Sequence, residues 1–441
     1  MVSAAADGSE KGIDRLRIGD LVLAFRIDNY SLLRAVYSLD TANAAVDAVI
    51  VALARLFTGV RIQRTEPGML YAAIPASTRR REHALPAMID SVCTLIMCRP
   101  LECDGERVYF SLSTGYAVAS DAHLSAAGTE ECLRIARDML CACRSAAERP
   151  TANDSAWADH YRADMRTAAT LLRQVDRGEA HFVWQPVCNA TEKEAILYYE
   201  ALLRTVSADG QQQPCGEAIG ALERLGLVRI LDQRTVSLVI DELEADPLVC
   251  LGVNISGQSA SFHLNGHDAF WSELRERLSR DRSLARRLVV EITETAAHSS
   301  LRETVDFVTQ LRALGCRIAI DDFGAGYASP RQLLALRPDI VKVDAFFLGA
   351  ATQHAETASA FPHMVGLARS LAPTVIAEGV ETAQQEEAAR ASGVQWLQGH
   401  QAGRPSVTRA WLDWDYRDSI RALVTFKSYS EAPAHNAQRA A

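Results

Sequence analysis

Two neighbouring carboxylates, Asp321 and Asp322, directly follow the apolar run 318–320 and precede a glycine-containing turn. At the end of a buried strand their charges repel each other by several kcal/mol, because the local dielectric is low. Divalent cations remove this repulsion, since one carboxylate can bridge two ions about 3.5–4 Å apart while its neighbour reaches the second ion. Two ions so placed can activate a water and stabilise the leaving oxygen of a phosphodiester. The pair therefore predicts phosphoryl chemistry.

Polar side chains also end the other apolar runs of the second half of the chain. The set comprises Gln185 beside Pro186, Glu200 with Arg204, Asn254, Glu291 with Glu294, Asp321 with Asp322, Lys342 with Asp344, Glu378 with Glu381, and Gln398. Oxygen ligands without His or Cys favour Mg²⁺ or Mn²⁺ over zinc. Each position alone has an ordinary explanation: Asn254 could cap a helix, and Lys342 could pair with Asp344. Their recurrence at the ends of successive runs favours one shared site.

The elements that must position these residues are eight apolar runs separated by helical patterns. The runs are 181–187, 196–204, 248–256, 286–294, 316–324, 339–347, 373–381 and 394–403. Near-continuous apolar strands alternating with helices indicate a parallel sheet covered by helices, and eight such units close into a TIM-like (βα)8 barrel of about 250 residues. In such a barrel the active site forms at the carboxyl ends of the strands, where the polar set falls.

The first half predicts a smaller α/β (α+β) domain over residues 18–150. Its strand-like runs are 20–28, 68–75 and 108–119, and its helical patterns are 41–57 and 84–97. A polar stretch around Pro150 marks the boundary, with Asp154 or Ser155 as a candidate N-cap. Apolar residues spaced by three or four from Trp157 predict a helical connector over 151–178, before a barrel at 179–425 and a disordered tail at 426–441.

Bulk composition limits the class of protein. A chain of 441 residues with 48% hydrophobic and 23% charged residues favours two globular domains. No apolar stretch reaches the roughly 20 residues of a membrane helix, and the start lacks a secretory h-region. Ten scattered cysteines suit free thiols, and a net charge of −9 argues against a nucleic-acid polymer as partner. We expect a cytoplasmic protein without membrane insertion.

At this point a family resemblance becomes specific. The segments "YYEALLR", "GVNIS", "VVEITE", "IDDFGAGYAS", "IVKVD", "IAEGVE" and "LQGHQAGRP" resemble, in order and spacing, those of EAL-domain phosphodiesterases. These enzymes cleave cyclic-di-GMP to linear 5′-pGpG, and the likeness covers about 175–425. It implies a homodimer formed through this domain and two divalent cations, Mg²⁺ or Mn²⁺. His400 and Ala402 depart from the pattern, because the family commonly has aromatic residues there.

The resemblance also implies roles for single residues. Glu200, Asn254, Glu291 and Asp321 would hold one cation, and Asp321 and Asp322 the other. Glu378 and Lys342 would position and deprotonate the attacking water, Arg204 would grip a phosphate oxygen, and Gln185 and Gln398 would line the pocket. Supporting and loop positions would be Glu294, Glu381 and Asp344, with Glu294 tying down the loop through Gly324, Tyr327 and Ser329.

The first half resembles a degenerate GGDEF domain, the diguanylate cyclase fold. The likeness rests on "FRIDNYSLL", "RTEPGMLYAAIP" and "LSTGYAVA". The signature is replaced by "EPGML" at 66–70, where Pro67 removes a backbone donor. Arg26 stands where the family has an aspartate, and Ser31 where it has a lysine. We expect no cyclase activity; GTP binding as an allosteric input stays open, and a structural or dimerising role is favoured.

One non-enzymatic alternative stays open. The chain could be a cyclic-di-GMP receptor that binds the nucleotide without cleaving it and signals through its first domain. Such receptors usually have eroded metal or base positions. Here the seven residues that the resemblance assigns to the metals and the water are all present, which favours the enzyme: Glu200, Asn254, Glu291, Asp321, Asp322, Lys342 and Glu378.

Overall fold

A computed structural model describes residues 13–78, 85–142, 155–207, 209–261, 269–293, 301–325 and 330–409. The chain forms two compact units that divide at Ala169, with Glu217–Leu231 and residues 269–274 also belonging to the first unit. The boundary expected at residue 150 and the tail expected at 426–441 lie outside the described residues.

The first unit is built on a four-stranded antiparallel sheet in the order β2-β3-β1-β6. The three predicted strands correspond to β1, β3 and β6, and the two predicted helices to α2 and α3. Its elements are β1 (Leu21–Ile27), α1 (Tyr30–Val36), α2 (Leu39–Leu56), β2 (Arg61–Arg64), β3 (Met69–Ile74), α3 (Leu85–Met97), β4 (Leu101–Cys103), β5 (Glu106–Val108), β6 (Leu112–Val118), α4 (Asp121–Ala127) and α5 (Thr129–Ala142).

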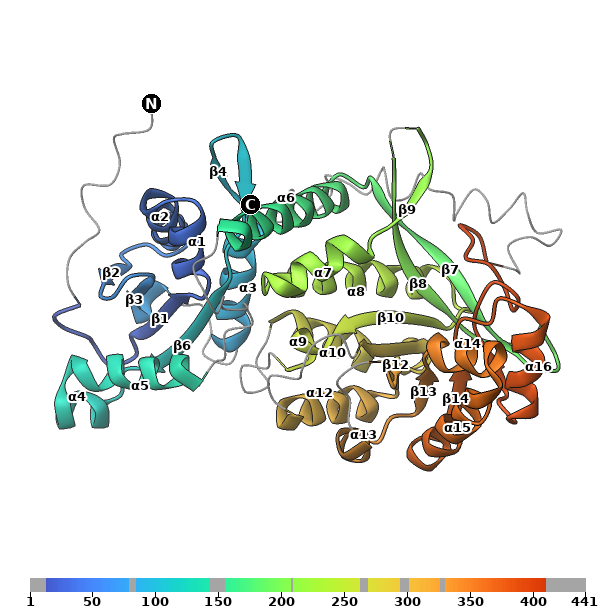
Figure 1. Ribbon diagram of the computed structural model, residues 1–441. Coiled ribbons are helices and arrows are strands. Elements are labelled where there is room, and N and C mark those ends of the chain that lie inside the picture. The colour runs from blue at the N-terminus through green and yellow to red at the C-terminus, as the bar shows by residue number, and fades with distance from the viewer. Residues whose placement is uncertain are drawn as a thin grey trace. The chain divides into compact units, whose positions relative to one another are not determined.

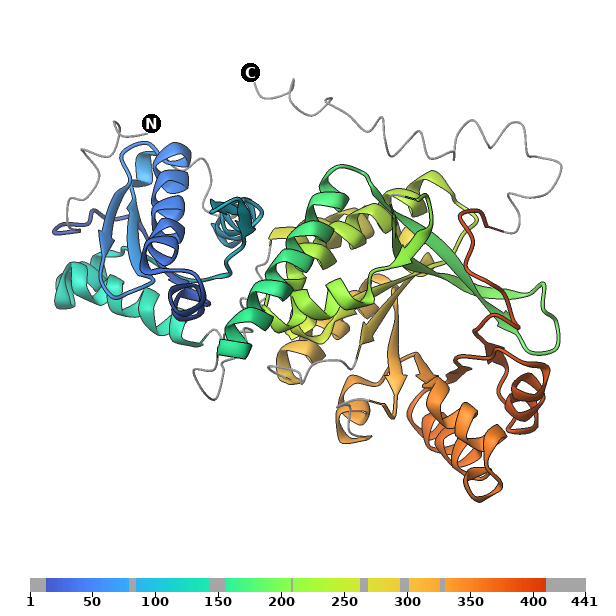
Figure 2. The same ribbon diagram turned by 45° about the horizontal axis from the view of Figure 1, so that its top comes forward.

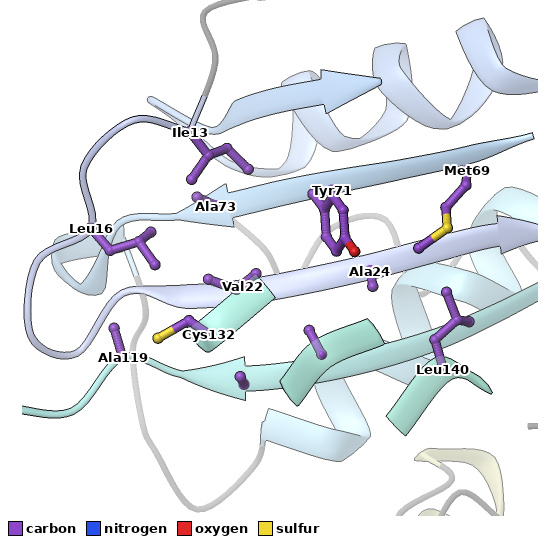
Figure 3. Close-up of a cluster of buried hydrophobic side chains, with 12 residues drawn as sticks. Ile13, Leu16, Val22, Ala24, Met69, Tyr71, Ala73, Ala119, Cys132 and Leu140 are labelled. Atoms are coloured by element: carbon purple, nitrogen blue, oxygen red, sulfur yellow. The ribbon is translucent and has the colours of Figure 1, made fainter. Parts of the chain in front are cut away.

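Helix α5 packs on one face of this sheet, where alternate strand residues such as Val22 and Ala24 meet Cys132 and Leu140 in a buried apolar cluster (Figure 3). Strand β6 contributes Gly115 where it meets this helix. A Cβ there would lie 2.1 Å from the carbonyl oxygen of Ala136. Only glycine therefore lets the helix lie this close to the sheet.

The predicted connector is one helix, α6 (Ser155–Asp176). Tyr161, Met165 and Leu172 of its predicted apolar face are buried. Within the first unit the Asn29 side-chain amide donates to the Tyr161 hydroxyl at 3.2 Å. The candidate N-cap Asp154 lies outside the described residues.

The second unit contains the predicted eight-stranded barrel, so the α/β fold class is confirmed (Figures 1 and 2). The ring runs β8-β10-β11-β12-β13-β14-β15-β7 and closes between β7 and β8, while β9 adds to the far end of β8. Its strands are β7 (Ala180–Asn189), β8 (Ile196–Val206), β9 (Gln212–Pro214), β10 (Leu251–Ser256), β11 (Leu288–Thr293), β12 (Arg317–Phe323), β13 (Ile340–Val343), β14 (Thr374–Ala377) and β15 (Trp396–Leu397).

The expectation of an all-parallel sheet is wrong for the first strand. β7 pairs antiparallel with both β8 and β15. The cause is local: the Asn189 side chain accepts hydrogen bonds from the backbone N–H groups of Thr191 and Glu192 at 2.9 and 3.1 Å, which turns the chain at once. The segment 190–195 is too short for a crossover, and a hairpin reverses the strand direction.

Helices follow the remaining strands along the chain. They are α7 (Gly216–Arg224), α8 (Val228–Ala245), α9 (Gly257–Ser261), α10 (Ala269–Arg280), α11 (Arg282–Arg287), α12 (Leu301–Leu314), α13 (Pro330–Leu336), α14 (Ala345–Gln353), α15 (Ala360–Leu371) and α16 (Ala383–Ala391). In the part of the chain that the structure describes, none of the helices has the length and apolar character needed to cross a membrane.

A layer of buried apolar side chains forms the floor of the barrel interior. Six strands contribute one residue each: Val187, Tyr198, Val289, Ala319, Ile340 and Ile376. This floor fixes which residues of each strand point inward, because side chains alternate between the two faces of a strand.

Candidate metal centre

The polar residues lie one inward-facing position beyond the apolar floor. A step of two along each parallel strand leads from the floor to Glu200, Glu291, Asp321, Lys342 and Glu378. On β7 the step runs backward, because this strand is reversed, and it leads from Val187 to Gln185. In register, Gln185 is paired with Glu200 and Asn254 with Glu291. One layer of the barrel therefore gathers the chemistry that the sequence distributes over eight strands.

Glu200 is 4% exposed and accepts hydrogen bonds from two amides. Asn254 Nδ2 lies 2.6 Å from Glu200 Oε1, and Gln398 Nε2 donates to Oε2. Burial raises the pKa of Glu200, but Lys342 and the two amides outweigh this and hold the pKa below its ordinary value. Glu200 is thus fixed as an oriented carboxylate.

Lys342 is fully buried at the centre of the carboxylates. Its Nζ lies 2.6 Å from Asp321 Oδ1, 2.7 Å from Glu291 Oε2, 2.9 Å from Glu378 Oε1 and 3.2 Å from Glu200 Oε2. Burial lowers the pKa of this amine, but the carboxylates outweigh burial and raise it well above its ordinary value. Lys342 is an ammonium in this environment.

The pairing of Lys342 with Asp344 that the sequence left open is not the arrangement found. Asp344 is the N-cap of α14, and its Oδ1 accepts from the Phe346 N–H at 2.8 Å. It also stays close enough to Asp322 to raise the pKa of that carboxyl.

Two groups of three carboxylates could each hold a metal ion. Glu200, Glu291 and Asp321 form one and Asp321, Asp322 and Glu378 the other, with ligand oxygens within 4.8 Å of one another in each group. We call these five residues the carboxylate cluster. Asp321 belongs to both groups. The sequence predicts that it bridges two ions, and this role stays a prediction.

The donor atoms fit hard divalent cations. Among the buried oxygens of the described residues that have no hydrogen-bond partner are three at this site: Asn254 Oδ1, Glu291 Oε1 and Glu378 Oε2. A buried polar atom without a partner costs free energy, and a cation bound to these oxygens would remove that cost. All are carboxylate or amide oxygens, the ligands that Mg²⁺ and Mn²⁺ prefer.

The pKa values of the cluster agree with this fit. Burial raises the pKa of Glu291 to about 8, and nearby Glu200 and Asp321 add to the effect against Lys342. Burial and then Asp321 raise the pKa of Asp322 to about 6. The same two causes, in the same order, raise the pKa of Glu378 well above its usual range. These carboxylates lack enough positive charge in their surroundings.

Asp322 points into the site because β12 is irregular. Neighbouring residues of a regular strand face opposite sides, yet the β12–β13 register shifts between Ile320 and Phe323. Asp322 has a φ of 52°, a left-handed conformation that is uncommon outside glycine. The irregularity brings both carboxylates of the pair into one group with Glu378, and such strain is typical of functional sites.

The structure places the other predicted residues less uniformly. Gln398 Nε2 lies 3.4 Å from Gln185 Oε1, so both border the cluster. Arg204 is half-buried two inward positions beyond Glu200, toward the rim, and its Nη1 donates to the Leu203 carbonyl at 2.9 Å. Glu381 is exposed ahead of α16. Glu294 falls outside the described residues, as do Tyr327 and Ser329.

Two residues that sequence reasoning missed complete the site from below. Tyr198 lies on the floor directly beneath Glu200, where burial and then Glu291 raise the pKa of its hydroxyl well above its usual value. Gly252, opposite Glu200 on β10, borders Glu291. Tyr198 could have been found from the sequence, because it precedes Glu200 by two residues and so shares its face of the strand. Gly252 could not, because its place beside Glu291 depends on the strand register.

Comparison with known proteins agrees with this geometry. The sequence model described as "EAL domain" matches residues 168–405. An uncharacterized signaling protein of Caulobacter vibrioides is 30% identical over 57% of this chain and 30% of its own. A probable cyclic di-GMP phosphodiesterase of Escherichia coli, PdeA, is 30% identical over 54% of this chain and 32% of its own. The chain spans about a third of the length of these curated relatives.

Among solved structures, Vibrio cholerae LapD S helix-GGDEF-EAL (apo) is similar over 88% of this chain and 89% of its own. The sequence identity is 20% and the TM-score 0.48.

Proposed function

The chain belongs to the EAL-domain family, and on this premise we propose that it hydrolyses cyclic di-GMP to linear 5′-pGpG with two divalent cations. The observation that carries the proposal is the sharing of Asp321 between two carboxylate groups in one barrel layer. Relatives described as cyclic di-GMP phosphodiesterases, PdeA and PdeF of Escherichia coli, support the substrate.

In this proposal Glu200, Asn254, Glu291 and Asp321 hold one ion, and Asp321 with Asp322 holds the other. Bound Mg²⁺ or Mn²⁺ would lower the pKa of a water and neutralise charge on the phosphodiester. Asn254 Nδ2 donates a hydrogen bond to Glu200, and this orients the side-chain amide so that its oxygen can bind an ion. The side-chain amide thus orients one ligand and supplies another.

Glu378 is the residue best suited to accept the proton of the attacking water. Its Oε1 is held by Lys342 at 2.9 Å while Oε2 has no hydrogen-bond partner among the described residues. Its raised pKa makes it a stronger base than an ordinary carboxylate. Lys342, already an ammonium, cannot accept a proton, so we assign it the task of positioning Glu378. The water oxygen bonds to phosphorus, and the bond from phosphorus to the ribose 3′-oxygen breaks.

Substrate contacts are proposed for three residues around the cluster. Gln185 and Gln398 border it, and Arg204, nearer the rim, offers a guanidinium for a phosphate oxygen.

For the first unit we propose a degenerate GGDEF domain without cyclase activity. Arg26 pairs with Asp28 at 3.0 Å, which puts a positive charge where cation-dependent cyclase chemistry needs a carboxylate. Glu66 of the altered signature pairs with Arg137 at 2.8 Å. Homodimerisation through the barrel and GTP binding to the first unit stay proposals of the family likeness, and a cytoplasmic location stays a proposal from composition.

Incubation of the purified chain with cyclic di-GMP and Mg²⁺ or Mn²⁺, followed by chromatography, tests the function. We expect the linear dinucleotide to accumulate. Nucleotide that binds and is recovered intact would instead assign the chain as a receptor. Recovery of unbound, intact nucleotide would reject both functions.

A further inference from the structure

We propose that Lys342 is a built-in competitor for the first metal ion: its ammonium sits where that ion would bind and must move when the ion enters. The inference rests on the proposed function only in treating Glu200, Glu291 and Asp321 as the seat of a cation.

The geometry gives the ammonium and a bound ion the same three partners. The ligand oxygens of these three residues lie within 4.8 Å of one another, and Lys342 Nζ contacts all three residues at 3.2, 2.7 and 2.6 Å. An ion bound to them would lie about 2.0–2.1 Å from each oxygen if it is Mg²⁺. Two positive centres a few ångströms apart in a buried site repel strongly. The ammonium and the ion are therefore alternative occupants.

The chain gives the displaced ammonium a place to go. The fourth contact of Nζ is Glu378 Oε1 at 2.9 Å, and Glu378 lies outside the first metal group. The four-carbon stem of lysine is flexible, so a rotation of the side chain keeps this contact while the other three are released. Binding of the ion would thereby leave Lys342 paired with Glu378, the residue proposed as the base.

Competition of this kind sets metal affinity. Removal of the lysine charge leaves the carboxylates uncompensated, so an ion gains their full attraction without displacing a bound partner. The same removal destabilises the chain before metal is added, because buried carboxylates then repel one another.

The test uses the full chain, stripped with a chelator and titrated with Mn²⁺ alone by calorimetry. We expect Lys342→Met to bind the first ion roughly tenfold more tightly than the wild type or better, and to gain more melting temperature on adding Mn²⁺. Lys342→Arg, which keeps the charge, should show no such gain. Equal or weaker binding by a folded Lys342→Met variant overturns the proposal.

Lys193→Met is the matched control, because Lys193 pairs with Glu386 at 3.0 Å outside the carboxylate cluster. It should leave Mn²⁺ affinity unchanged; tighter binding there would show that the effect is not local and overturn the proposal. Circular dichroism reports whether each variant is folded before titration.

A crystal of the wild type grown with Mn²⁺ tests the idea without any variant. Nζ should have left Glu200 and Glu291 while keeping Glu378. An ion and Nζ both contacting the same three carboxylates would overturn the proposal even if Lys342→Met does not fold. Absence of hydrolysis together with tighter Mn²⁺ binding would reject only the proposed enzyme. Hydrolysis by the wild type without tighter binding by the variant would reject only the competition.

Discussion

A Cβ atom on Gly252 would lie 2.2 Å from Glu291 Oε1 and 2.7 Å from Tyr198 Cε2. Because Gly252 has no side chain, it leaves room for the fully buried carboxylate of Glu291.

Gly252→Ala should therefore displace Glu291 and weaken the first metal group. We expect Mn²⁺ affinity to fall roughly 10–100-fold, the size of effect that residues supporting metal ligands have, with hydrolysis falling at least as far. Calorimetry with Mn²⁺ and the dinucleotide assay measure the two losses.

Gly366→Ala is its control, since Gly366 lies in α15 with no atom within 4 Å of an added Cβ. It should keep metal affinity and, as an exposed helical glycine, gain about 0.5–1 kcal/mol of stability. Unchanged Mn²⁺ binding in a folded Gly252→Ala protein would contradict the assignment of Glu291.

Glu200→Gln should nearly abolish hydrolysis while the barrel stays folded. The substitution keeps shape but removes a ligand charge and leaves Lys342 with one partner fewer, so we expect turnover to fall by roughly 100-fold or more. Product formation by chromatography measures it, and the exposed Glu387→Gln on α16 serves as control. Full turnover in Glu200→Gln would remove the first metal group from the mechanism.

Removal of the divalent cations should stop hydrolysis, and their return should raise the thermal stability of the chain. Treatment with EDTA is expected to stop hydrolysis, and Mg²⁺ or Mn²⁺ to restore it and raise the melting temperature, because an ion that binds only the folded chain stabilises it. Differential scanning fluorimetry follows the second effect without substrate. Full turnover in metal-free buffer would contradict the two-ion mechanism.

Asp28 should make the first unit less stable as pH rises. Burial raises the pKa of Asp28 to about 6 from 3.8, against the opposing effects of Arg26 and Ser113. The folded chain then binds the proton more tightly than the unfolded chain, so this contribution is complete below pH 3.8 and lost as pH rises through about 6. The loss is at most roughly 3 kcal/mol.

Hydrogen exchange of the β1 amides between pH 4 and 7 measures this effect, after correction for the intrinsic exchange rate. The difference in opening free energy between the wild type and Asp28→Asn should shrink or change sign along that range. The difference between the wild type and the exposed Asp138→Asn should not depend on pH. A difference independent of pH would show that Asp28 titrates normally.

The fold and most of the candidate site could be predicted from the sequence, because the alternation of apolar and polar residues and the spacing of the apolar runs are local properties. Glu200, Glu291, Asp321 and Glu378 could be assigned to strand ends from the sequence, since each follows an apolar run. The direction of β7 could not, because it depends on how the Asn189 side chain folds the turn after it.

The detailed chemistry of the cluster also needed three dimensions. Sequence proximity suggested Asp344, two residues away, as a partner of Lys342, but in the barrel four carboxylates from four other strands surround the amine. The inward turn of Asp322 likewise depends on a register shift against β13 that leaves no mark in composition.

The reversed direction of β7 has a consequence for how the polypeptide arrives at the reaction. A parallel first strand would begin on the floor side of the barrel, away from the rim. Here Ala180 and His181 lie across from Thr205 and Arg204, so the chain enters the barrel beside the arginine that we propose as a phosphate ligand. Residues 177–179 alone separate α6 from this end of β7, so a movement of α6 would be transmitted to the rim within three residues.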